Sequence, residues 1–187
     1  MSDVALAVIA RSSIIPDPAR LSDLERSDLA TIRGERRRDE WIRGRLAIRQ
    51  VIGDPEASIV VEADGSPRSV GGAPRSVSLS HDGEWFAVAV AKEGARLGVD
   101  LCVRDHAVRV TRILAWLGVA TACDPVVAWA SLEVVLKLRR LSVEALRDCT
   151  LAVDEVALDR IAVRGLGDPV TVAVRHAPAY VVAWATA

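Results

Sequence analysis

The stretch VSLSHDGEWFAVAVAKEGARLGVDLCV, residues 77–103, decides the fold. Its β-branched, aromatic and alternating residues predict three consecutive strands, over residues 77–80, 85–91 and 97–103. The turn residues HDGE between the first two strands are typical of a hairpin or a bulged turn. We therefore expect the middle of the chain to be rich in strands.

Helical patterns lie on both sides of these strands. Helical spacing of apolar residues occurs in residues 23–32, 35–52, 106–118 and 125–140. Ser22 and Glu25 fit a capping box at the start of the first helix. Asp124 is placed to cap the last helix, with proline in its first turn. Because apolar residues surround that last helix almost completely, we expect it to be largely buried.

Further strands complete the predicted fold. They are expected over residues 4–10, 158–164, 169–175 and 179–186. Residues 64–76 have the composition of a loop. The chain thus runs from helices to strands twice over, which predicts an α+β fold with two similar lobes, although no sequence repeat proves the duplication.

Composition narrows the functional classes. The chain has 187 residues, of which 51% are apolar and 26% charged, so it should fold as a globule. The net charge of −1 argues against a dedicated nucleic-acid binder. Three cysteines without C-x-x-C spacing, no basic leader and no run of 18 apolar residues favour a reduced, cytoplasmic protein outside the membrane. The oligomeric state stays open, because the apolar last strand has the character of an edge that pairs with another copy.

Polar residues interrupt the apolar pattern at three places. Ser80 and His81 end the strand that starts at residue 77, and Asp100 lies within the strand 97–103. Glu133 and Lys137 lie one turn apart on the helix expected to be buried, where unpaired charges are costly. The simpler alternatives are a helix-surface ion pair, a turn aspartate and a structural histidine.

Other polar features carry weaker hypotheses. The arginines of residues 36–45 form either a solvated face, offset by nearby acidic residues, or a dock for an acidic partner or a phosphate. Cys102 lacks a base nearby in the sequence that would support a nucleophilic role. His106 and His176 are isolated in the sequence, and no metal-ligand spacing links them.

Taken in order, these segments resemble the 4′-phosphopantetheinyl transferases, of the type that activates peptide and polyketide synthases. The matching stretches are Gly65-Ser66-Pro67, Ser78-Leu79-Ser80-His81, Gly98-Val99-Asp100-Leu101-Cys102 and Trp129 to Lys137, together with the helix that carries Arg38, Trp41, Gly44, Arg45 and Arg49. The resemblance covers residues 35–140. It implies two lobes, residues 1–95 and 96–187, each a small antiparallel sheet packed with helices, forming one pseudo-twofold unit.

The resemblance also implies an activity, the transfer of phosphopantetheine from coenzyme A to a serine of an acyl or peptidyl carrier protein, with release of 3′,5′-ADP. Asp100 and Glu133 would be ligands of Mg²⁺, and Glu133 would also accept the serine proton through a water. Lys137 would contact the phosphates.

The same resemblance places the nucleotide end of coenzyme A. Ser80 and His81 would hold its 3′-phosphate, and Arg45 would reach the same end. Arg68 would replace the lysine of the family's Gly-Lys-Pro loop, which is Ser66 here. The site would lie in the cleft between the lobes.

Three departures from the family pattern keep a second function open. Ser66 and Leu132 replace lysines, and Cys102 replaces a glutamate, although thiols are poor ligands of Mg²⁺. The alternative is a transferase fold repurposed in natural-product biosynthesis, which cyclises or dehydrates a polyketide-like intermediate or only binds a partner. Its acid and base groups would be Asp100, Glu133, His81 and Cys102.

Overall fold

The computed structural model describes residues 4–63, 65–71, 73–147 and 149–187. These residues form four α-helices and two mostly antiparallel sheets, which confirms the predicted α+β class. The helices are α1 (Asp23–Thr31), α2 (Glu35–Ile52), α3 (Ala107–Trp116) and α4 (Pro125–Arg139), with 3₁₀ turns η1 (Arg11–Ser13), η2 (Pro18–Arg20), η3 (Arg104–His106) and η4 (Val143–Leu146). The strands are β1 (Ala5–Ala10), β2 (Ser58–Val61), β3 (Pro67–Val70), β4 (Arg75–Asp82), β5 (Trp85–Lys92), β6 (Leu97–Val103), β7 (Ala120–Thr121), β8 (Ala152–Ala157), β9 (Arg160–Arg164), β10 (Val170–His176) and β11 (Tyr180–Thr186).

The chain divides into two compact units. The first contains the described residues up to Leu79 together with Glu84–Ala95, and the second contains Ser80–Gly83 and the described residues of Arg96–Ala187. The end of β4 therefore belongs to the second unit, although it lies among the first 95 residues of the chain. This detail brings Ser80, His81 and Asp82 to the elements that build the candidate site.

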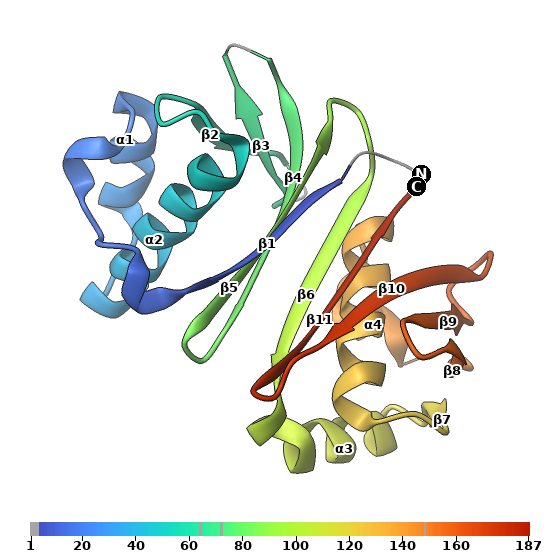
Figure 1. Ribbon diagram of the computed structural model, residues 1–187. Helices are drawn as coiled ribbons and strands as arrows, with labels where there is room; N and C mark the ends of the chain where they lie inside the picture. The colour runs from blue at the N-terminus through green and yellow to red at the C-terminus, as the bar shows by residue number, and fades with distance from the viewer. Residues whose placement is uncertain (1–3, 64, 72, 148) are drawn as a thin grey trace. The chain divides into compact units, whose positions relative to one another are not determined.

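The first unit is a sheet covered by two helices. Its strands follow the order β1-β5-β4-β3-β2, and α1 and α2 lie on one face of it (Figure 1). Ser22 accepts a hydrogen bond from the backbone N–H of Glu25, whose carboxylate accepts one from the N–H of Ser22, so the predicted capping box is confirmed. Gly53 ends α2 at φ 77°, a conformation that glycine adopts without strain. Phe86 and Ile48 are among the fully buried residues of its core.

The loop predicted over residues 64–76 is wrong in part. Pro67–Val70 form β3, and β4 begins already at Arg75. β3 pairs with β2, another strand that the sequence did not indicate, with Ile59 opposite Ser69. Gly65, at φ 83°, donates its N–H to the carbonyl oxygen of Glu62 between these short strands. Turn residues dominate the composition of the segment, and their abundance hides strands of only four residues.

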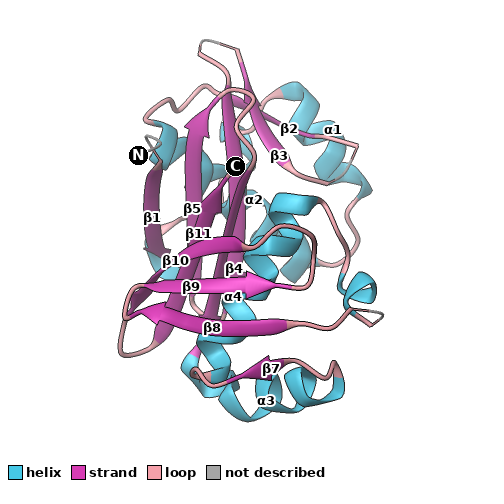
Figure 2. Cartoon of the chain, turned by 90° about the vertical axis from the view of Figure 1, so that its right-hand side faces the viewer, coloured by secondary structure: helices cyan, strands magenta, loops and turns pink. Residues whose placement is uncertain are grey.

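The second unit is a sheet packed on one long helix. Its strands follow the order β6-β11-β10-β9-β8-β7, and Figure 2 shows β8, β9 and β10 side by side. Within the described residues, neighbouring strands of this sheet are antiparallel except for the short parallel pair of β7 and β8. The prediction of three strands after residue 157 missed β8 before it. Asp154 and Glu155 interrupt the apolar alternation of that strand and so conceal it in the sequence.

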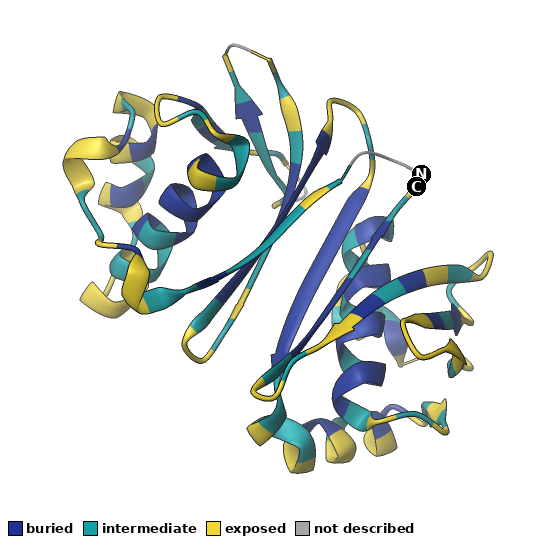
Figure 3. Ribbon diagram, viewed as in Figure 1, coloured by how far each residue is buried: buried dark blue, intermediate teal, exposed yellow. Residues whose placement is uncertain are grey.

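Helix α4 is buried on most of its surface, as its composition predicts (Figure 3). Asp124 accepts a hydrogen bond from the N–H of Val126 at 2.8 Å, which confirms the predicted cap. The helix lies against β6, and a Cβ added at Gly98 would stand 2.5 Å from the carbonyl oxygen of Val134. Glycine at this position therefore allows the helix backbone to approach the strand closely.

In the described part of the chain, none of the helices combines the length and the apolar character that crossing a bilayer requires.

We expect Gly98→Ala to destabilise the protein by about 1–3 kcal/mol or more, because a new methyl group must displace backbone rather than a side chain. Gly44→Ala is the matched control, since its Cβ would meet only the flexible end of Leu79, at 3.0 Å. Urea unfolding of both variants measures the difference. Equal stability of the two variants would contradict the close approach of α4 to β6.

Candidate functional site

A pocket of about 270 Å³ lies within the second unit. Its walls come from the end of β4, from β6, from η3 with the start of α3, and from α4. The residues that line it are Ser80, His81, Asp82, Asp100, Leu101, Cys102, His106, Arg109, Val110, Ile113, Trp129 and Glu133. Polar and ionisable groups therefore converge on one hollow whose remaining walls are apolar, a combination that is typical of ligand sites.

The carboxylate of Asp100 is buried at this pocket and accepts two side-chain hydrogen bonds. It is 6% exposed, and its Oδ1 accepts hydrogen bonds from Ser80 Oγ at 2.7 Å and from Lys137 Nζ at 2.9 Å. Lys137 also donates to the carbonyl oxygen of Val99 at 2.8 Å, and Ser80 Oγ accepts from the N–H of Leu101 at 3.2 Å. The charge of Lys137 offsets the cost of burying the Asp100 carboxylate.

The pairing of Lys137 with Asp100 differs from the simpler alternative, an ion pair of Lys137 with Glu133 on the helix surface. Lys137 reaches from α4 to β6 and bonds Asp100, so it is not a simple partner of Glu133 on the helix surface. Trp129 and Glu133 lie on the same helix and both line the pocket. The i, i+4 spacing thus brings Trp129 and Glu133 to the pocket and Lys137 to the carboxylate of β6.

Glu133 is a carboxyl group in an unfavourable setting. Burial raises its pKa, the negative charge of Asp100 raises it further, and the positive charge of Lys137 opposes both effects. Two carboxyl groups thus repel each other inside one pocket. A bound cation or a retained proton on Glu133 relieves that repulsion.

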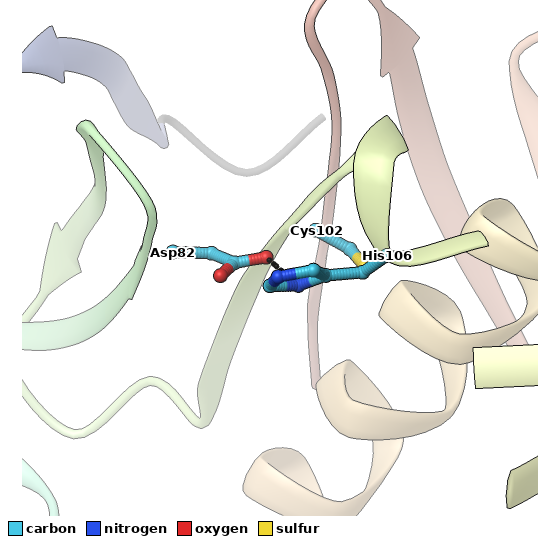
Figure 4. A group of neighbouring side chains, drawn as sticks. All are labelled: Asp82, Cys102 and His106. Atoms are coloured by element: carbon cyan, nitrogen blue, oxygen red, sulfur yellow. Dashed lines mark ion pairs between the residues drawn. The ribbon is translucent and has the colours of Figure 1, made fainter. Parts of the chain in front are cut away.

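A second group of ligand-type atoms lies beside this pair. Asp82 Oδ2 is 3.0 Å from His106 Nδ1 and also accepts a hydrogen bond from the N–H of Val103 at 2.9 Å. The thiol of Cys102 completes the group, and the three ligand atoms all lie within 4.8 Å of one another (Figure 4). These three residues line the same pocket, so a carboxylate, an imidazole and a sulfur all border it.

The Cys102 thiol does not have the character of a nucleophile. Burial, followed by the negative charges of Asp82, Asp100 and Asp124, raises its pKa to about 12, against a small opposing effect of Arg109. At neutral pH the group is therefore a protonated thiol rather than a reactive thiolate.

The structure brings together five of the seven predicted site residues. Asp100, Glu133, Lys137, Ser80 and His81 all belong to the second unit, and all of them except Lys137 line its pocket. Lys137 contacts the pocket through its bond to Asp100.

The other two predicted site residues belong to the first unit. Arg45 is 5% exposed, lies 4.3 Å from the ring centre of Trp41, and has its Nε 4.0 Å from the Glu25 carboxylate. Burial lowers the pKa of Arg45. Arg68, on β3, forms an ion pair with Glu62 at 2.5 Å. Within the described residues, both guanidinium groups thus serve contacts of the first unit, and their roles toward a nucleotide stay predictions.

The three positions that depart from the family pattern lie in different surroundings, so they affect the pocket to different degrees. Leu132 is fully buried in the core of the second unit, so its side chain does not face the pocket. Cys102 lines the pocket, and its sulfur therefore changes the ligand chemistry there. Ser66 lies in the turn between β2 and β3, where its carbonyl oxygen accepts a hydrogen bond from the N–H of Glu62.

Asp82, His106 and Arg109 also line the pocket, although the sequence pattern did not indicate them as site residues. His106 follows Cys102 by four residues, and this C-x₃-H spacing was the only local signal. Asp82 is adjacent to the predicted His81, and its link to His106 spans 24 positions and arises only when the end of β4 meets η3.

Comparison with known protein families finds no family that matches this chain, and comparison with curated proteins finds no relative.

We expect Glu133→Gln to stabilise the protein at neutral pH when divalent cations are absent. The raised pKa of Glu133 means that the folded state resists ionisation of this group, so stability falls as pH rises above its ordinary value of 4.5 and stays lower at neutral pH. The glutamine variant lacks this loss, and its thermal midpoint should exceed that of the parent at pH 7 but not at pH 4.

Thermal unfolding in EDTA across this pH range measures the effect. Glu155→Gln, at an exposed position of β8, is the matched control and should follow the parent. A glutamine variant at position 133 that is less stable than the parent at pH 7 would show that the carboxylate is favourably paired.

Proposed function

We propose that the protein is a Mg²⁺-dependent transferase that moves phosphopantetheine from coenzyme A to a serine of an acyl or peptidyl carrier protein. One observation carries the proposal: Asp100 and Glu133, from strand and helix, line the same pocket, and the charge of the first raises the pKa of the second. The order of motifs over residues 35–140 supplies the substrate class.

The donor set suits a magnesium ion that keeps part of its water shell. Mg²⁺ prefers oxygen ligands and is commonly held by one or two carboxylates plus substrate phosphates. Asp100 and Glu133 would hold it, whereas Cys102 offers sulfur and would not take part. When bound, the ion neutralises charge on the pyrophosphate.

The ammonium group of Lys137 is set up to bind a phosphate. It has three N–H donors, and the bonds to Asp100 and to the Val99 carbonyl use two of them. The third is left for an oxygen of the pyrophosphate. Because the group is anchored at two points, little freedom is lost when a phosphate binds.

Transfer requires a nucleophile, a proton acceptor and a leaving group. The carrier serine oxygen forms a bond to the phosphorus on the pantetheine side, while the phosphorus–oxygen bond to 3′,5′-ADP breaks and the ADP takes the electron pair. Glu133 accepts the serine proton through a water, a role that suits a carboxyl group with a raised pKa. His81 lies at the pocket and would bind the 3′-phosphate, whereas the predicted role of Ser80 there would require its hydroxyl to give up the hydrogen bond that it donates to Asp100.

The test is incubation of the purified chain with coenzyme A, Mg²⁺ and a panel of apo carrier proteins, followed by mass spectrometry of the carrier. We expect one phosphopantetheine per carrier, loss of product in EDTA, and recovery on adding Mg²⁺. Glu133→Gln should slow transfer by about 100-fold or more, the range for a lost acid–base group.

Glu155→Gln is the control and should keep the parent rate, because its side chain is exposed on β8 outside the pocket. Absence of product on every carrier, with the parent chain folded, would overturn the proposal. Product formation that is equal in the parent and in Glu133→Gln would remove the assigned role of the carboxylate.

A second candidate, acid–base chemistry on a natural-product intermediate, is favoured by Cys102 in the pocket. Replacing an oxygen ligand by a thiol weakens Mg²⁺ binding, and a carboxyl group with a raised pKa can donate a proton. The pocket volume of 270 Å³ also lies just below the range of about 300–1,000 Å³ that is typical of ligand sites. Calorimetry with coenzyme A distinguishes the two candidates, since Mg²⁺-dependent binding supports the transferase and its absence supports this alternative.

A further inference from the structure

The Asp82, Cys102 and His106 side chains form a group that the transferase chemistry does not use. They come from the end of β4, from β6 and from η3, and their ligand atoms lie within 4.8 Å of one another. Figure 4 shows the carboxylate, the imidazole and the sulfur as neighbours. Carboxylate, imidazole and thiolate are the three kinds of ligand that zinc takes in proteins.

The spacing of these atoms is close to that of a tetrahedral zinc site. With metal–ligand bonds of 2.0–2.3 Å, the ligand atoms of such a site are about 3.3–3.6 Å apart. Asp82 Oδ2 and His106 Nδ1 are already 3.0 Å apart, and the sulfur needs to move by no more than about 1.5 Å to reach this spacing. A change of rotamer at one side chain covers that distance.

The hydrogen bonds around these three side chains also fit a metal site. Val103 N–H donates to Asp82 Oδ2 and so orients the carboxylate, as an outer-shell hydrogen bond does in metal sites. The thiol of Cys102 is 3.8 Å from its acceptor, the Val103 carbonyl oxygen, so this weak bond offers little resistance to a metal. All three residues line the pocket, which leaves a fourth position open to solvent or a ligand.

We propose that Asp82, Cys102 and His106 bind a Zn²⁺ ion with three protein ligands and an open fourth position facing the pocket. This site is separate from the acidic pair of Asp100 and Glu133, which supplies only hard oxygen ligands. The two sites select different metals because thiolate and imidazole favour zinc, whereas carboxylates and water favour magnesium.

Zinc binding also gives the buried thiol a role. Without a metal the thiol has, among the described residues, only its weak bond to the Val103 carbonyl oxygen. A coordinated thiol is deprotonated by the metal, and its proton passes to the buffer as the sulfur–zinc bond forms. The positive charge of the ion then faces Asp82 and the nearby Asp100, whose negative charges favour it.

The test measures metal binding alone and needs neither coenzyme A nor a carrier. The metal-free full-length chain is titrated with Zn²⁺ under equilibrium dialysis, and with Co²⁺ while the near-ultraviolet band of sulfur-to-cobalt charge transfer is recorded. We expect one equivalent of zinc and a cobalt band. Cys102→Ser should abolish the band and weaken zinc binding by more than about 100-fold, since even outer-shell changes cost 10–100-fold.

Matched control variants distinguish zinc binding at this site from zinc binding by other cysteine and histidine side chains of the protein. Cys123→Ser and His176→Ala should bind zinc as the parent does, because both residues lie outside the pocket. His106→Gln is a second ligand variant, chosen because this side chain is 38% exposed and its replacement should leave the fold intact. It should weaken zinc binding as Cys102→Ser does.

Three outcomes would overturn the proposal: no stoichiometric zinc, zinc binding unchanged in both ligand variants, or zinc binding lost in Glu133→Gln while Cys102→Ser retains it. The last outcome would assign the metal to the acidic pair. Failure of carrier modification with a preserved zinc site would instead overturn only the transferase.

Discussion

The ion pair between Lys137 and Asp100 is the interaction on which the second unit depends. A carboxylate that is 6% exposed on a strand inside an apolar core is costly unless it is paired and hydrogen-bonded. Lys137 supplies that charge from α4, which must therefore lie directly against β6. Gly98 makes this approach possible by leaving room for the Val134 carbonyl. The same contact that completes the core thus fixes the position of the acidic group in the pocket.

Much of the fold follows from local sequence signals. The capping box at Ser22 and Glu25 and the proline start of α4 each have a local physical cause, so both were predicted. The sequence did not predict β3 and β8, because these strands are stabilised by pairing with neighbouring strands rather than by their own composition. Short strands that carry charged or turn-forming residues acquire their structure from the sheet.

The residues of the candidate site also fall into two groups, those that a local sequence pattern indicates and those that it does not. Asp100, Glu133 and Lys137 were found because a charge inside an apolar pattern must have a partner, and the i, i+4 spacing places two of them on one helix. Asp82 and His106 were not found because their contact depends on where β4 ends relative to η3, which no local pattern encodes. Contacts between elements that are distant in the chain therefore cannot be predicted from a single sequence.

Position 102 connects both metal hypotheses. Residues two apart on a strand point to the same face, so Asp100 and Cys102 of β6 both contribute to the pocket. An oxygen ligand at position 102 would extend the acidic pair into a harder magnesium site. A thiol instead joins the side chains of Asp82 and His106, and it divides the pocket into an oxygen side and a sulfur side. The oxygen ligands of the acidic pair would therefore favour Mg²⁺, whereas the Sγ of Cys102 would favour Zn²⁺ at the neighbouring group of Asp82 and His106.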